Sequence, residues 1–89
     1  MRVGWSLSDG VTLAETPDGV VLLDEHKGRY WQLNDTGGVV LRSLLGGGGV
    51  EEAVAELRRR YPSVGDTVAV DVQKVVGRLE ASGMVRDES

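Results

Sequence analysis

The chain has 89 residues and a mass of 9.5 kDa, which allows one small domain with a modest core. It contains no cysteine and one histidine, which excludes disulfides, thiolate nucleophiles and multi-histidine metal sites. Its formal net charge of −4 disfavours a nucleic-acid-binding function, because phosphate recognition usually draws on a basic face.

The sequence shows neither a membrane-spanning segment nor a secretion signal. Apolar runs stay well below the roughly 18 residues that a spanning helix needs. The first residues, MRVGW, lack the apolar stretch of a signal peptide. We therefore expect a cytoplasmic protein without membrane contact.

The first half of the chain has strand-like composition. Residues 1–10 show no sustained periodicity and are expected to form a flexible N-terminal arm. Turn-forming sequences follow at residues 16–19 (TPDG) and 25–28 (EHKG). The predicted strands around these turns are residues 11–15, 20–24 and 29–33. Because tight turns join neighbouring strands, these segments predict a three-stranded antiparallel sheet.

The second half has helical periodicity. Asn34 or Asp35 is placed to cap a first helix, which the glycines at 46–49 end. A second, amphipathic helix is expected over residues 50–61.

A third helix is predicted after Asp66 or Thr67, either of which has a capping side chain, and it ends at Gly83. Residues 84–86 are expected to be extended, and residues 87–89 to fray. The element order predicts an α+β fold, a three-stranded antiparallel sheet followed by a three-helix unit, similar to a winged helix-turn-helix. One domain over residues 11–86 accounts for it.

The residue types that perform catalysis occur here without the other residues that a catalytic motif requires. His26 lies in a polar turn and no nucleophile motif accompanies it. Glu51 and Glu52 are adjacent on a predicted helix, so their side chains point about 100° apart. The glycines at 46–49 lack the Lys-Ser/Thr of a phosphate-binding loop. We expect no enzyme activity, no metal and no cofactor.

A DNA-binding regulator is the alternative to a peptide-binding module. Arg58–Arg60 is a basic run, and a winged helix-turn-helix would place the third helix in the major groove. The polar side of that helix, however, mixes Lys74 and Arg78 with Asp71 and Glu80, whose carboxylates would repel phosphates. The missing basic stripe favours a peptide or protein partner.

Residues 28–37 (GRYWQLNDTG) resemble the signature of the PqqD-like family, the leader-recognition elements of ribosomally synthesised, post-translationally modified peptides. Aromatic residues, Leu-Asn and Thr-Gly stand in the family order. The later matches are Val40-Leu41, Leu44-Leu45, Val50-Glu51-Glu52, Tyr61, Asp71-Val72, Leu79 and Gly83. The resemblance covers residues 11–86, and Gly38 and Leu41 depart from the commoner family residues. A freestanding copy of this length resembles the accessory protein of lasso-peptide biosynthesis.

The resemblance implies how such a domain binds. The leader of a precursor peptide adds as a strand to the edge of strand 29–33, in a groove beside the third helix. The candidate peptide-binding residues are Arg29, Tyr30, Trp31, Gln32, Leu33, Asp71, Val72, Lys74, Val75, Arg78 and Leu79. Periodicity leaves open which face of the strand meets the helices. The alternative to peptide contact is a core role for Val72, Val75 and Leu79. For Arg29, Lys74 and Arg78 it is a solvated surface role, and for Trp31 it is a core or lid role.

The resemblance also implies partners. A separate leader-removing protease and an ATP-dependent cyclase would receive the captured precursor. Quinone-cofactor assembly, the role of the family's eponymous member, is a further alternative that a different neighbouring precursor would indicate. The exposed strand edge is compatible with a monomer or with a weak dimer that pairs through that edge.

Overall fold

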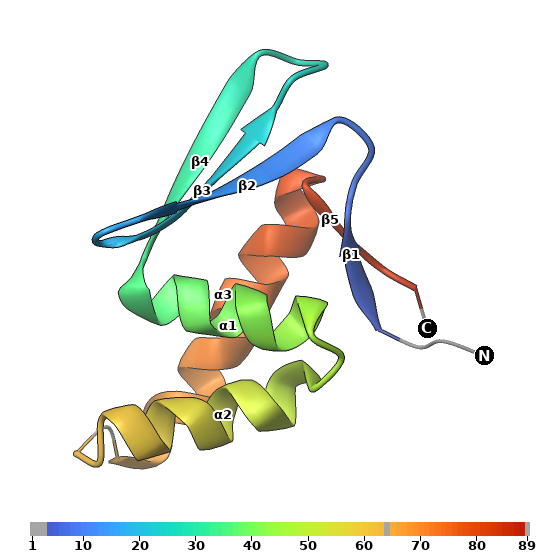
Figure 1. The fold of residues 1–89 in the computed structure, drawn as a ribbon. Helices are drawn as coiled ribbons and strands as arrows, with labels where there is room; N and C mark the ends of the chain where they lie inside the picture. The colour runs from blue at the N-terminus through green and yellow to red at the C-terminus, as the bar shows by residue number, and fades with distance from the viewer. Residues whose placement is uncertain (1–3, 64, 89) are drawn as a thin grey trace.

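The two predicted turns fold residues 11–34 into an antiparallel sheet of strand order β2-β3-β4 (Figure 1). This computed structural model describes residues 4–63 and 65–88. The three strands are β2 (Val11–Thr16), β3 (Gly19–Asp24) and β4 (Arg29–Asn34). Each is a residue or so longer than its sequence pattern indicated, and the predicted third strand corresponds to β4.

Three helices follow the sheet, as predicted. They are α1 (Asp35–Leu45), α2 (Gly49–Arg60) and α3 (Val68–Ser82), with the 3₁₀ turn η1 (Gly65–Thr67) before α3. The Asn34 side chain caps α1 by accepting a hydrogen bond from the N–H of Gly37 (2.8 Å). Gly83 ends α3 with a φ of +77°, in the left-handed region where glycine is favoured. The α+β fold class is confirmed.

The start of α3 differs from the prediction. Asp66 and Thr67 lie in η1, and the Thr67 side chain makes no capping hydrogen bond to α3. The helix begins as a direct continuation of the 3₁₀ turn, so the backbone of the turn, and not a capping side chain, precedes its first residue.

The first and last segments of the described chain pair with one another, which corrects the expectation of a flexible arm and a frayed end. β1 (Trp5–Leu7) and β5 (Val85–Asp87) form a two-stranded antiparallel sheet. Further backbone bonds extend it, from Ser8 N–H to the Met84 carbonyl (2.9 Å) and from Glu88 N–H to the Gly4 carbonyl (2.7 Å). Residues 1–3 and 89 of the predicted arm and end lie outside the described residues. The expected extended segment at residues 84–86 largely coincides with β5, whereas β1, with three residues, is too short to show alternation and was not predicted.

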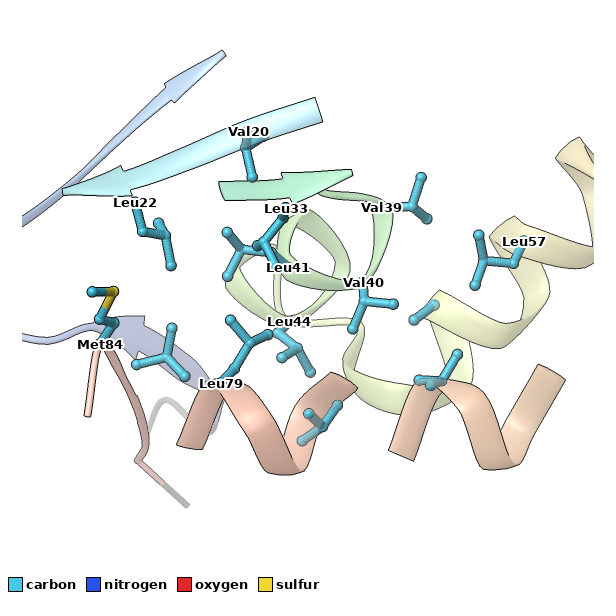
Figure 2. Packing of buried hydrophobic residues seen from close by; sticks show 14 of the residues in the cluster. Val20, Leu22, Leu33, Val39, Val40, Leu41, Leu44, Leu57, Leu79 and Met84 are labelled. Carbon is cyan, nitrogen blue, oxygen red and sulfur yellow. The ribbon is translucent and has the colours of Figure 1, made fainter. Parts of the chain in front are cut away.

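The core lies between one face of the sheet and the helices (Figure 2). Val20 and Leu22 of β3 are fully buried there and point toward Leu41 and Leu44 of α1. Leu79 brings α3 into the same cluster. The helices therefore cover one face of the sheet and leave the other open (Figure 1). In the part of the chain that the structure describes, no helix is long and apolar enough to cross a membrane.

Candidate functional site

β4 is an edge strand, and among the described residues β3 is its strand neighbour in the sheet. Hydrogen bonds of an antiparallel pair join every second residue, and the bond from Glu25 N–H to the Gly10 carbonyl (2.9 Å) sets that alternation along β3. With the observed register, β4 forms its backbone hydrogen bonds to β3 through Arg29, Trp31 and Leu33. The backbone groups of Tyr30 and Gln32 therefore point to the open edge, ready to pair with an added strand.

The packing decides which face of β4 meets the helices. Leu33 is buried and Trp31 is half-buried against the core, so these two side chains lie on the inner face. Tyr30 is 69% exposed on the opposite face. The sequence left these two faces undistinguished, because alternation gives the period of a strand but not the location of its neighbours.

A hollow of about 200 Å³ lies between the inner side of the β4 edge and α3. Its lining residues are Trp31, Gln32, Leu33, Asn34, Gly37, Val75 and Arg78. Trp31 and the half-buried Val75 give it apolar walls, and the Arg78 guanidinium gives it a cation. The hollow lies beside the open backbone edge, so a strand added to β4 would place side chains above it.

Five of the eleven candidate residues line this hollow together. They are Trp31, Gln32, Leu33, Val75 and Arg78. Val72 and Leu79 are 1% and 0% exposed, so they hold α3 to the core rather than offer a contact surface. Asp71 and Lys74 are exposed on α3 outside the hollow lining, and Tyr30 lies on the outer face of the sheet.

Arg29 links β4 to the end of α3. Its guanidinium donates a hydrogen bond to the carbonyl of Ser82 (2.6 Å), in the last turn of α3. Its Nε lies 3.8 Å from Asp24 Oδ2. The buried Asp24 also accepts hydrogen bonds from the N–H groups of His26 and Lys27 (3.1 Å each). Arg29 thus connects β4, its preceding turn and the end of α3.

Two lining residues, Asn34 and Gly37, were not among the candidates. They form the junction between β4 and α1, where the Asn34 side chain caps the helix. Both stand in the Leu-Asn-x-Thr-Gly string, so the signal was present in the sequence. The capping role of Asn34 was predicted, but the proximity of both residues to α3 depends on how the helices pack.

A second hollow, of about 170 Å³, lies between α1 and α2 and is mainly polar. Arg42 at its rim reaches across to Glu15 of β2 (2.6 Å). This hydrogen-bonded pairing lowers the pKa of the Glu15 carboxyl and raises the pKa of the Arg42 guanidinium. Nearby, Tyr61 donates a hydrogen bond to Asp35, which raises the pKa of the Tyr61 hydroxyl. These contacts tie the elements together on the side of α1 away from the groove.

Metal binding finds no support in the described part of the chain. No group of three or more histidine or carboxylate side chains is placed there to hold an ion. The candidate site is an open strand edge beside a hollow with both apolar and polar lining residues, and this arrangement has the features of a site that could accept an added peptide strand.

Comparison with protein families assigns the chain to a class. Residues 19–85 match the family described as coenzyme PQQ synthesis protein D (PqqD), so the chain belongs to this family and is a PqqD-like recognition element of ribosomally synthesised, modified peptides. The match includes β3, β4 and all three helices. Comparison with curated protein sequences gives no match.

Two solved structures are similar over nearly the whole chain. One is described as lasso peptide synthetase B1 complexed with the leader peptide, with 31% identity, a TM-score of 0.82, and coverage of 93% of this chain and 98% of that chain. The other is TbiB1 in complex with the TbiA(beta) leader peptide, with 27% identity, a TM-score of 0.78, and coverage of 100% and 99%. Both similar structures are therefore complexes with a leader peptide.

Proposed function

We propose that this chain is a non-catalytic module that binds the leader of a ribosomal precursor peptide in lasso-peptide biosynthesis. The leader adds as a strand to the open edge of β4 and places side chains over the hollow beside α3. The observation that carries this proposal is the juxtaposition of the unpaired edge at Tyr30 and Gln32 with the Trp31–Val75 hollow. The two similar structures, each a complex with a leader peptide, support it.

The backbone edge alone is insufficient for tight binding. In an antiparallel pairing, Tyr30 and Gln32 each exchange two hydrogen bonds with the leader, and about four bonds contribute roughly 4 kcal/mol. Micromolar affinity corresponds to about 8 kcal/mol, and ordering a flexible leader costs about 2–5 kcal/mol more. Side chains buried in the hollow must supply the difference, at about 1.5–3 kcal/mol for each large apolar group.

The alternation of the edge assigns positions to the leader. The leader residue opposite Trp31 directs its side chain to the inner face and so into the hollow. Val75 would contact an apolar anchor there, while Arg78 would meet a leader carboxylate at the rim. After capture, the module delivers the precursor to a separate leader-removing protease and an ATP-dependent cyclase.

The direct test is a titration that follows the backbone amides of the protein by NMR. The probe is a synthetic leader peptide of the short precursor encoded beside the gene for this chain, a gene neighbour that the proposal requires. Binding should shift the amides of β4 and of the groove side of α3 and leave those of α2 in place. Unmoved β4 amides at saturating leader would refute strand addition. A shift of mixed DNA duplex in low salt, with a steep salt dependence, would instead support the winged-helix alternative.

Val75→Asp tests the hollow. A carboxylate in this apolar wall must be desolvated when the leader binds, so we expect leader affinity, measured by calorimetry, to fall at least about tenfold. Val70→Asp is the matched control, because Val70 lies on the same helix, is 55% exposed and does not line the hollow. Equal affinities of the two variants, with both folded, would remove Val75 from the binding site.

A further inference from the structure

The outer face of the sheet carries two large apolar side chains that the fold leaves uncovered. Tyr30 is 69% exposed and Leu23 is 42% exposed. They are opposite one another in the β3–β4 register, and Leu23 in turn is opposite Thr12 of β2. The row runs across the sheet and ends, at Tyr30, on the open edge of β4. The helices pack on the other face of the sheet, so this row faces away from them (Figure 1).

The same alternation that directs one leader residue into the hollow directs its neighbours to this outer face. Tyr30 and Gln32 are the β4 residues whose backbone groups point to the open edge. A leader residue paired with Tyr30 therefore exchanges backbone bonds with it and lies on the same face, with Cβ atoms about 5 Å apart. That leader residue is adjacent in sequence to the one opposite Trp31, which enters the hollow.

The two outward positions of the leader meet different surroundings. The one opposite Tyr30 continues an aromatic and aliphatic row, Tyr30 and Leu23. The one opposite Gln32 meets a polar side chain on the edge. Tyrosine at a strand edge offers a large amphipathic surface at a small cost in conformational entropy, which suits a contact with a peptide.

We propose that Tyr30, supported by Leu23, is a second specificity subsite that takes an apolar or aromatic leader side chain on the outer face of the sheet. This inference rests on the proposed strand addition at β4. The leader is then recognised on both faces, by one side chain in the hollow and by the adjacent side chain against Tyr30. The position opposite Gln32 tolerates polar residues.

Three variants test the protein side of this subsite by calorimetry with the same synthetic leader. Tyr30→Ser removes the ring and should weaken binding about tenfold, whereas Tyr30→Phe retains the ring and should stay within about twofold. Thr12→Ala is the control, because Thr12 lies in the same row but two strands from the edge. Thermal melts establish that each variant is folded.

Alanine substitution of the leader tests the other side with unaltered protein, and so decides the matter even if Tyr30→Ser fails to fold. The two leader residues that flank the hollow-facing residue are replaced in turn, and the one opposite Tyr30 should cost about tenfold in affinity. If neither replacement weakens binding, or if folded Tyr30→Ser binds as tightly as wild type while β4 amides still shift, the subsite is refuted and strand addition stands. If the β4 amides of the wild-type protein do not shift when the leader is added, strand addition itself is refuted.

Discussion

Gly19 begins β3 and is opposite Asn34, the last residue of β4. Its φ is +154°, and a Cβ built there would overlap the carbonyl oxygen of Leu33. Gly28, in the turn before β4, also has a positive φ, of +64°, but no atom lies within 4 Å of a Cβ there. A side chain at position 19 would therefore meet both an unfavourable φ and a steric overlap, whereas one at position 28 would meet only the unfavourable φ.

Gly19→Ala should lower the free energy of unfolding by about 3 kcal/mol, because strain and overlap with a ladder carbonyl combine. Gly28→Ala should lower it by about 1 kcal/mol, since it has strain alone. Urea unfolding of both variants measures the difference. Losses of equal size would show that the sheet backbone moves to accept the methyl group at position 19.

At the scale of elements, α3 has two packing roles. Val72, Val76 and Leu79 hold it to the core, and the groove side carries Val75 and Arg78. Gly77 lies exposed in the interior of this 15-residue helix, and a Cβ there would meet nothing within 4 Å. A glycine raises the backbone entropy of the unfolded chain and so destabilises a helix. At Gly77 no neighbouring atom in the folded protein requires the absence of a side chain.

Gly77→Ala should therefore raise the free energy of unfolding by about 0.5–1 kcal/mol and leave leader affinity unchanged. Gly83→Ala, at the end of the same helix, should lower it by about 1 kcal/mol, because φ at Gly83 is +77°. Denaturant unfolding of the pair provides the check. Stabilisation by both substitutions would contradict the left-handed helix end.

At the scale of the whole molecule, polar contacts between elements complement the apolar core. Glu15 on β2 pairs with Arg42 on α1, and this hydrogen bond lowers the pKa of the Glu15 carboxyl from its ordinary value of 4.5. A lowered folded-state pKa contributes stability that is complete above the unfolded value and is lost as pH falls through the folded pKa. The sheet-to-helix contact is thus weakened in acid.

Glu15→Gln should make the free energy of unfolding fall less between pH 7 and about pH 3 than it does in the wild type, since the variant has no carboxylate to protonate. Glu25→Gln, at an exposed turn position, is the control and should follow the wild-type curve. Unfolding measured by circular dichroism at a series of pH values tests this. Parallel curves for wild type and Glu15→Gln would show that the exposed pair contributes nothing measurable.

Local signals in the sequence determined most of the elements. The Thr-Pro-Asp-Gly turn, the Asn34 cap and the Gly83 helix end depend on backbone conformations that particular residues favour, so each was recognisable without a tertiary structure. Helical periodicity likewise placed α1, α2 and α3, and the family motif over residues 28–37 indicated the edge strand to which we propose that a peptide binds.

Only the tertiary structure decided which faces and which distant segments meet. Periodicity marked Tyr30 and Trp31 as opposite faces of one strand, but packing against α1 and α3 placed Trp31 at the hollow and left Tyr30 outside. It likewise buried Val72 and Leu79 and left Val75 half-buried in the wall of the hollow, although all three belong to one apolar stripe. β1 and β5 pair across almost the whole length of the chain. Such contacts depend on the relative positions of elements in space, and local periodicity contains no information about them.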